Sequence, residues 1–276
     1  MLFHCGKFQF DLSRPLVMGI VNVTPDSFSD GGRTLQCEAA LAHAHHLIHE
    51  GADILDIGGE STRPGALPVS VQEEMERIMP VIEGLRDVLI PLSVDTCKPE
   101  VMRAALAAGV SMVNDINALQ HPDALSAVAA SDAAVCLMHM KGSPQTMQEQ
   151  PQYPDVMAEV LRFLRKRMDA VQAAGIARER IVVDPGFGFG KTLAHNLTLL
   201  RGLGTLGELG VPVLAGLSRK SMLGTITGQD VNHRVPASVA AALLAVQRGA
   251  HIVRVHDVGA TVDTLKVWNA VNGATK

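Results

Sequence analysis

The stretch VMGIVNVT (Val17–Thr24), followed at once by PDSFSDGG (Pro25–Gly32), decides which fold the chain can adopt. The first string is an apolar run of strand length, and the second is rich in turn-forming residues. A doubly wound open sheet usually has a glycine-rich turn after its first strand, and Thr24-Pro25-Asp26-Ser27 stands there instead. The stretch therefore favours a closed barrel over an open sheet.

Seven further apolar runs of strand length follow along the chain. They are Asp53–Gly59, Pro91–Thr96, Met112–Ile116, Ala134–Met140, Ile181–Pro185, Val211–Ser218 and His251–Val258. Helical patterns separate them, at Cys37–Glu50, Val71–Val88, Pro99–Ala108, Asp123–Ala130, Pro154–Ala174, Asn196–Leu203, Pro236–Arg248 and Thr261–Asn272. Because strands and helices alternate, we expect parallel strands joined by right-handed crossovers.

Eight such units predict a (β/α)₈ TIM barrel, and 276 residues suit one domain of that kind. Hydrophobic residues make up 47% of the chain and aromatic residues only 3%, so aliphatic side chains must fill the barrel. The alternation in Phe8–Leu12 predicts a strand. We expect the first fourteen residues to form a β-hairpin that closes the bottom of the barrel.

Charge and cysteine usage exclude several classes of protein. The net charge of -4 gives no basic field for nucleic acid, and no apolar run is long enough to span a bilayer. Met1–Arg14 does not have the pattern of a signal peptide. The four cysteines lie far apart without CxxC spacing, which predicts reduced thiols and a cytoplasmic protein.

Polar residues end nearly every predicted strand, where barrel enzymes have their active sites. These residues are Asn22 and Thr24, Asp56 to Glu60, Asp95, Asn114 and Asp115, Met138 and His139, Asp184, Ser218, and Arg254 to Asp257. Each would cost on the order of 1–3 kcal/mol if it were buried unpaired. The pattern therefore predicts one polar site for a small molecule.

The loops after the first two strands have the composition of ligand-binding segments. The first is long, carries Phe28 in its middle, and is expected to act as a lid. In the second, glycines allow close approach to a ligand, and Ser61, Thr62 and Arg63 offer donors to an anion.

Three later segments add donors and a glycine-rich loop. DPGFGFGKT (Asp184–Thr192) is not a P-loop, because Pro185 stands where that motif requires glycine; we expect its two phenylalanines to pack over a ligand. Ser218 is predicted to cap a short helix whose start, with Lys220, attracts an anion. Arg254 and His256 are two apart on a strand, so their side chains point to the same face and can both bind one phosphate.

Seven strings together resemble the dihydropteroate synthase family. They are MGIVNVTPDSFSDGG (Met18–Gly32), DIGGESTRPGA (Asp56–Ala66), SVDTCKPEV (Ser93–Val101), VNDI (Val113–Ile116), DPGFGFGKT (Asp184–Thr192), GLSRKSMLG (Gly216–Gly224) and RVHDV (Arg254–Val258). They occur in the family's order, and the resemblance covers Pro15 to about Val267. This range is the barrel core of about residues 15–267 within a single domain, 1–276.

The resemblance implies a reaction of folate synthesis. In it, 6-hydroxymethyl-7,8-dihydropterin diphosphate condenses with 4-aminobenzoate to give 7,8-dihydropteroate and diphosphate. The N–H groups of the pterin need hydrogen-bond acceptors, and its carbonyl needs a hydrogen-bond donor. The implied pterin-binding residues are Asp95, Asn114, Ile116, Met138, Asp184, Gly216 and Lys220.

The resemblance also implies where the other reactants bind. The implied diphosphate-binding residues are Asn22, Thr62, Arg63, Arg254 and His256, with Mg²⁺ as the cofactor and Asn22 as its protein ligand. The implied aminobenzoate pocket contains Pro25, Phe28, Thr62, Arg63, Pro64, Phe189, Lys220 and Ser221. Sulfonamides, which mimic aminobenzoate, are expected to compete for it.

The implied catalytic residues are Asp95, Lys220, Arg254 and His256. We expect dissociative substitution at the pterin methylene, without a protein nucleophile. Two alternatives remain at this point: a pterin-binding methyltransferase that serves a corrinoid, and a barrel that senses pterin without catalysis. The family resemblance further suggests a homodimer built from helices on the outer wall.

Overall fold

The computed structural model describes residues 1–24, 33–62 and 65–273 and shows the predicted barrel. Eight parallel strands follow the order β8-β7-β6-β5-β4-β3-β10-β9. A bridge between Val183 and Val213 joins the two end strands, so the barrel is nearly closed. The strands are β3 (Leu16–Asn22), β4 (Ile54–Gly58), β5 (Leu92–Asp95), β6 (Met112–Asp115), β7 (Ala134–Met138), β8 (Ile181–Asp184), β9 (Leu214–Ala215) and β10 (Ile252–Val255).

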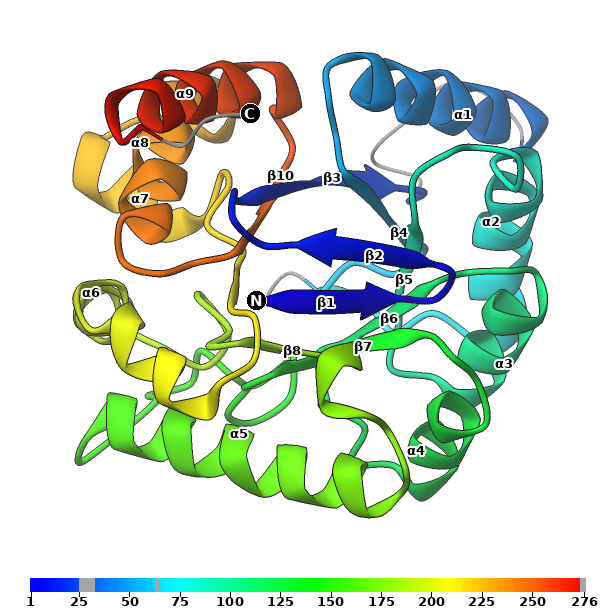
Figure 1. Ribbon diagram of the computed structural model, residues 1–276, viewed down its shortest axis with the longest axis horizontal. Helices are drawn as coiled ribbons and strands as arrows, with labels where there is room; N and C mark the ends of the chain where they lie inside the picture. The colour runs from blue at the N-terminus through cyan, green and yellow to red at the C-terminus, as the bar shows by residue number, and fades with distance from the viewer. Residues whose placement is uncertain (25–32, 63–64, 274–276) are drawn as a thin grey trace.

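A ring of α-helices surrounds the strands (Figure 1). The helices are α1 (Arg33–His49), α2 (Val71–Gly84), α3 (Pro99–Ala107), α4 (Pro122–Ala129), α5 (Val156–Ala173), α6 (Leu193–Arg201), α7 (Ser221–Thr227), α8 (Val235–Val246) and α9 (Val258–Val271). Capping residues fix where some of them begin: Ser70 accepts from the Glu73 N–H, and Asp155 accepts from the Ala158 N–H. Within the described part of the chain, no helix is long and apolar enough to cross a membrane.

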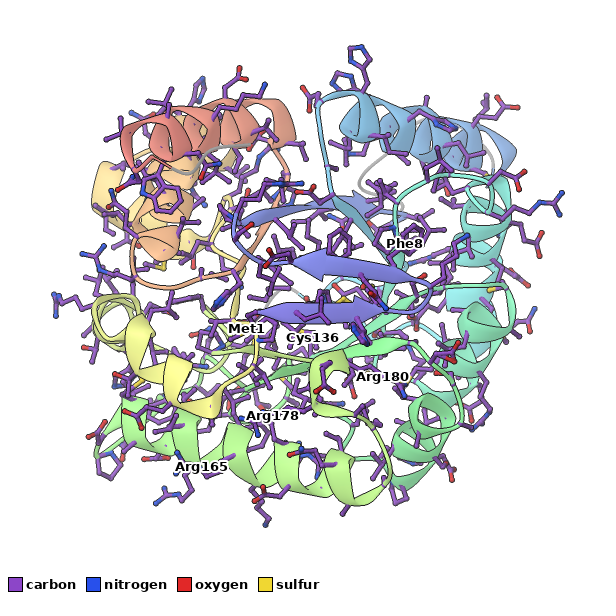
Figure 2. All side chains as sticks on the ribbon, viewed as in Figure 1. Met1, Phe8, Cys136, Arg165, Arg178 and Arg180 are labelled. Carbon is purple, nitrogen blue, oxygen red and sulfur yellow. The ribbon has the colours of Figure 1, made fainter. Side chains whose placement is uncertain are left out.

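The predicted N-terminal hairpin is present and lies across one end of the barrel (Figure 1). Strands β1 (Leu2–Cys5) and β2 (Phe8–Asp11) pair antiparallel, with Phe3 opposite Phe10. Phe3 and Cys5 are fully buried and pack with the inward side chains of the barrel strands. Figure 2 shows Cys136 of β7 in the middle of the ring of helices, whereas Arg165 of α5 lies at its edge.

Strand β9 is much shorter than the predicted range Val211–Ser218. Pro212 has no N–H to donate, and the Val213 N–H is used by the ring of His251, at 3.2 Å from Nδ1. Regular pairing with β10 therefore begins only at Leu214.

The barrel interior changes from apolar to polar along the strands. Residues two apart on a strand point to the same side. Near the hairpin the inward side chains are apolar, as with Leu16, Ile54 and Met112. Toward the carboxyl ends they become polar, as with Asp56 and Asn114. The polar end of the barrel is therefore the place for a site.

Candidate active site

A hydrogen-bonded group of four side chains forms the floor of the polar end. Asp56 on β4 accepts from Arg254 Nε of β10 at 2.6 Å and from Asn114 Nδ2 of β6 at 2.9 Å, both at Oδ2. Arg254 Nη2 also donates to Asp95 Oδ2 of β5 at 2.7 Å. One guanidinium thus holds two carboxylates on the inside of the barrel.

Asp95 is an unusual carboxyl group within this floor. Burial raises its pKa above the ordinary value, and the nearby carboxylates of Asp56, Glu74 and Asp115 raise it further. Among the described residues, the Arg254 guanidinium opposes this shift. The environment therefore favours a neutral or hydrogen-bonded state of Asp95 more than water does.

Asp184, Gly216 and Lys220 extend the floor across β8 and the segment after β9. Asp184 is buried, and its Oδ1 accepts from the Gly186 N–H at 2.6 Å. A Cβ on Gly216 would lie 4.0 Å from Asp184 Oδ2 and 3.9 Å from Arg254 Cβ, so a side chain here would contact both residues, and the glycine leaves them uncovered on this side. The Lys220 ammonium lies 4.3 Å from the centre of the Phe189 ring, and burial lowers its pKa to about 8.

The glycine-rich loop between β8 and α6 is held by side-chain donors at five consecutive carbonyls. Lys191 Nζ donates to the carbonyls of Gly186 and Phe189, each at 2.9 Å. Lys220, Gln148 and Tyr153 donate to the three other carbonyl groups, those of Phe187, Gly188 and Gly190. Side chains from outside and inside the loop thus fix its carbonyls, and the loop contacts the Lys220 side chain at Phe187 and Phe189.

One expectation about this loop changes. Phe187 is fully buried in the core, so only the half-buried Phe189 can face a ligand. Lys191 is buried and lies 3.0 Å from Nδ1 of His139, whose pKa burial lowers to about 3. A neutral His139 can accept from Lys191, so both of these residues are parts of the loop's support.

The segments after β9 and β10 are linked to each other twice. Ser218 Oγ lies 3.0 Å from His256 Nδ1 and accepts from the His256 N–H at 3.2 Å. Arg219 makes a bidentate pair with Asp257, at 3.1 and 2.5 Å. The prediction that Ser218 caps a helix was wrong, because α7 begins after Lys220 and the Ser218 hydroxyl is used by His256. These links hold His256 beside the strand that carries Arg254.

The remaining predicted residues lie at or after the carboxyl ends of the strands, wherever the structure describes them. Asn22 is the last residue of β3 and pairs in register with Gly58. Ile116 and Met138 are buried, Thr62 is half-buried, and Ser221 is exposed at the first position of α7. Pro25, Phe28, Arg63 and Pro64 lie outside the described residues.

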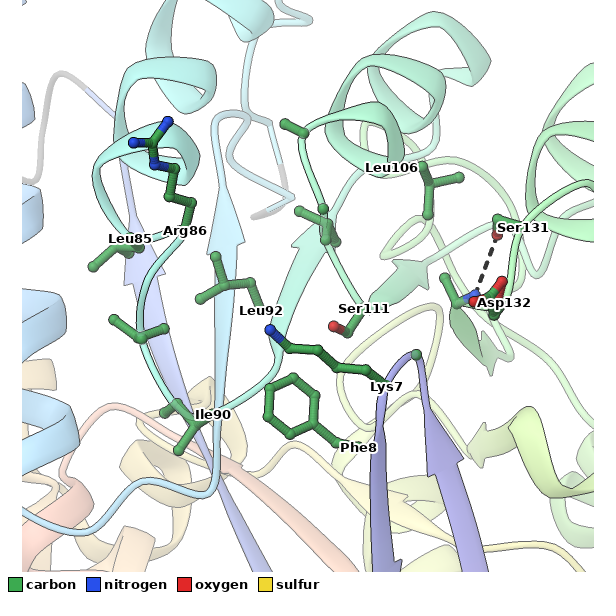
Figure 3. Close-up of a pocket in the computed structure, with 16 residues that line it drawn as sticks. Lys7, Phe8, Leu85, Arg86, Ile90, Leu92, Leu106, Ser111, Ser131 and Asp132 are labelled. Atoms are coloured by element: carbon green, nitrogen blue, oxygen red, sulfur yellow. Dashed lines mark hydrogen bonds between the residues drawn. The ribbon is translucent and has the colours of Figure 1, made fainter.

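A groove lies at the opposite end of the barrel from the polar floor (Figure 3). This groove of about 340 Å³ runs between the hairpin turn at Lys7 and Phe8 and the segments that lead into β5, β6 and β7, with Ile90 and Ser111 among its lining residues. None of the predicted site residues that the structure describes lines it. The groove is therefore separate from the polar end.

Comparison with known proteins links this geometry to a family. Residues 18–256 match the family described as "Pterin binding enzyme". A dihydropteroate synthase of Neisseria meningitidis serogroup C is 53% identical over 98% of this chain and 97% of its own length.

Two solved structures are similar in both sequence and fold. A Xanthomonas albilineans dihydropteroate synthase with 4-aminobenzoic acid is 58% identical, covers 98% of each chain and has a TM-score of 0.93. A Yersinia pestis dihydropteroate synthase in a sulfonamide drug complex is 48% identical, covers 99% of this chain and 100% of its own, and has a TM-score of 0.94.

Proposed function

The chain belongs to the dihydropteroate synthase family of pterin-binding enzymes. From this membership we propose that the polar end of the barrel condenses 6-hydroxymethyl-7,8-dihydropterin diphosphate with 4-aminobenzoate. The products are 7,8-dihydropteroate and diphosphate, so the protein is a transferase of folate synthesis. The observation that carries the proposal is the inward floor of Asp95, Asn114, Asp184, Lys220 and Arg254, which offers acceptors and donors side by side.

The pterin ring is matched by the hydrogen-bonding groups of this floor. Asp95, Asn114 and Asp184 provide oxygen acceptors for the pterin N–H groups. Lys220 provides the donor for the pterin carbonyl, while Gly216 leaves Asp184 and Arg254 uncovered on its side. Because each polar group would be left unpaired by a mismatched analogue, such a site selects strongly for its ring.

We assign the diphosphate to Arg254 and His256, with Thr62 and Arg63 from the second loop. Arg254 Nε and Nη2 are engaged by Asp56 and Asp95, and no described residue accepts from its Nη1. Asn22 fits a magnesium ion, since it presents a hard oxygen ligand at a strand end across from a glycine. Bound there with substrate phosphate and water, Mg²⁺ would neutralise charge on the diphosphate.

The chemical step is a substitution at the pterin methylene carbon. The C–O bond to diphosphate breaks and its electron pair leaves with the diphosphate, next to the cationic Arg254. The positive charge spreads into the pterin ring, where the ionised form of the Asp95 carboxyl group beneath offsets it. The aminobenzoate nitrogen then forms the C–N bond and releases a proton to solvent. No protein nucleophile is required.

The aminobenzoate pocket is placed beside Lys220, at the start of α7. Ser221 is exposed at the start of this helix, and we assign it to the carboxylate of the aminobenzoate. Phe189 and Thr62 are assigned to the same pocket. Pro25, Phe28, Arg63 and Pro64 complete the proposed pocket from the segments outside the described residues. Sulfonamides should compete at this pocket, as the Yersinia pestis relative's complex with such a drug supports.

The outer wall supports a homodimer. Ile226 on α7, Leu244 on α8 and Val267 and Val271 on α9 are large apolar side chains that are 40–80% exposed. These three helices lie next to one another (Figure 1). Association of two copies would remove this apolar surface from water; light scattering should give twice the chain mass.

Unpaired cysteines, buried or partly buried, are consistent with a cytoplasmic protein.

The proposed reaction is tested by mixing the protein with the pterin diphosphate, labelled 4-aminobenzoate and Mg²⁺. Labelled dihydropteroate is the expected product, and Asp95→Asn should lower the rate strongly. Pterin binding without any product would favour the non-catalytic alternative, and methyl transfer from a folate to a corrinoid would favour the methyltransferase. A trapped covalent pterin–protein adduct, or full activity of Asp95→Asn, would contradict the dissociative scheme.

A further inference from the structure

Asp56 is a fully buried carboxylate that contacts two of the proposed binding residues at the same time. Its Oδ2 accepts from Asn114 Nδ2 at 2.9 Å and from Arg254 Nε at 2.6 Å. We infer that Asp56 is a positioning residue that fixes the amide of Asn114 for the pterin and the guanidinium of Arg254 for the diphosphate. The identity of these two ligands rests on the proposed function.

The contact with Asp56 decides which way the Asn114 amide faces. A carboxylate only accepts hydrogen bonds, so Asn114 must turn its NH₂ group toward Asp56. Its Oδ1 is then the atom that is turned away from Asp56. Because the pterin edge presents N–H groups, an acceptor is the group that it needs at this position. A neutral residue in place of Asp56 would let the amide adopt either orientation.

The contact with Arg254 has a different consequence. Arg254 is shared by Asp56 and Asp95, but Asp95 is also a proposed acceptor for the pterin. When the pterin engages Asp95, Asp56 still holds the Nε side of the guanidinium. The cation therefore keeps its place and its charge partner while the diphosphate binds and leaves.

The strand register explains why Asp56 acts through other residues. Asp56 pairs with Ser93, whereas Asp95 pairs with Gly58, which is two positions further along β4. Asp56 thus lies one inward layer below Asp95, closer to the hairpin end. Its side chain is completely buried, with Arg254 and Asn114 bonded to the oxygen that faces them.

The experiment compares Asp56→Asn with a matched variant from the same layer. Ser93→Ala is the control, because Ser93 is the register partner of Asp56, is also fully buried, and its hydroxyl has no partner among the described residues. Calorimetry measures binding of two probes, 6-hydroxymethyl-7,8-dihydropterin and inorganic diphosphate with Mg²⁺. Loss of a charge-assisted hydrogen bond predicts about tenfold or weaker affinity of Asp56→Asn for both probes. Ser93→Ala should bind both like the parent chain.

A double-mutant cycle separates positioning from general damage. If Asp56 acts on the pterin through Asn114, Asp56→Asn should weaken pterin binding by less than about twofold in an Asn114→Ala background. In the same background it should still weaken diphosphate binding about tenfold. Additive losses for the pterin, or unchanged binding of both probes by Asp56→Asn, would overturn the inference.

A second variant covers the case in which Asp56→Asn does not fold. Asn114→Asp keeps an acceptor for the pterin but removes the N–H that faces Asp56, so the pterin affinity should fall about tenfold. An unchanged affinity would overturn the inference. Both readouts are binding constants, so they stay informative even if the parent chain forms no dihydropteroate, which would count against the proposed reaction alone.

Discussion

At Arg254 a single guanidinium connects the carboxylates at the bottom of the site to the proposed diphosphate position. Its Nε and Nη2 are 2.6 and 2.7 Å from Asp56 and Asp95. These two bonds orient the side chain before any ligand arrives, which lowers the entropy lost on binding. A substitution of Arg254 should therefore weaken binding of the diphosphate group more than binding of the pterin.

Arg254→Ala should therefore weaken binding of inorganic diphosphate more than binding of the free dihydropterin. Removal of a charge-assisted contact to phosphate corresponds to about tenfold or more in the dissociation constant. Calorimetry with the two ligands measures both effects on one protein preparation. Equal losses for the two ligands would show that Arg254 is not the phosphate contact.

Lys220 should set an alkaline limit to pterin binding. Burial lowers its pKa from the ordinary lysine value to about 8, although Asp184 opposes that shift. Below this pH the ammonium is charged and can donate to the pterin carbonyl; above it a proton is lost and the contact weakens. The expected kcat/KM for the pterin diphosphate thus falls as the pH rises through about 8.

Lys220→Arg is the control for this assignment, because arginine stays protonated throughout this range. The alkaline fall should disappear in this variant, whatever the size of its remaining activity. If the fall stays at the same pH, another group must cause it. Lys191 is the first candidate, since burial lowers its pKa to about 7.

Most residues of the floor could be predicted from the sequence, but the layer that each of them occupies inside the barrel could not. Asp95, Asn114, Asp184 and Arg254 were predicted from the strand ends and the resemblance, and the structure brings them together. Asp56 was noted only as one of several polar residues, because alternation tells which side of a strand a residue faces but not which layer it occupies. That information requires the register between strands.

At the scale of elements, the loop of residues 186–190 shows why a motif can mislead. Its glycines and two phenylalanines predicted a loop that packs over a ligand, yet Phe187 is fully buried and Lys191 donates to the carbonyls of the loop. This buried lysine depends on carbonyl groups of its own loop and of His139, which follows a different strand. Spacing in the sequence cannot reveal such contacts. The helix boundaries were more predictable, within a few residues for most helices.

Gly188→Ala should affect the pterin site through its contact with Lys220. Gly188 has a φ of +81°, and an added Cβ would lie 3.0 Å from Lys220 Cδ. The Lys220 side chain would have to move, so the KM for the pterin diphosphate should rise severalfold.

Gly228→Ala is the matched control for this change. Gly228 has a similar φ of +72°, but a Cβ there would meet open space. Both variants should lose about 1 kcal/mol of stability because of the left-handed backbone, as measured by urea unfolding. Only Gly188→Ala should change the KM. An equal change in both would mean that backbone strain, rather than the position of Lys220, controls pterin binding.

At the scale of the whole molecule, stability and chemistry are placed at opposite ends of one barrel. The hairpin covers the apolar end, where Phe3 and Cys5 pack on inward aliphatic side chains. The polar floor faces the other end, where the Arg254 guanidinium holds the carboxylates of Asp56 and Asp95. The division follows from the strands themselves, whose inward positions change from apolar to polar along their length.

Phe3→Ala should therefore lower stability without changing the site. Phe3 is fully buried, and its ring stacks on Phe10 at 6.1 Å between centroids. Removal of such a ring from a packed core costs about 3–5 kcal/mol in the free energy of unfolding, which urea denaturation would measure. Leu89→Ala is the control, since Leu89 is 92% exposed and should change stability by less than about 0.5 kcal/mol.

In the folded Phe3→Ala protein, the KM for the pterin diphosphate should stay within about twofold of the parent value, because mutations at distant sites without shared partners act independently. A larger rise in KM, with the protein still folded, would mean that the hairpin end and the polar floor are coupled through the layers between them.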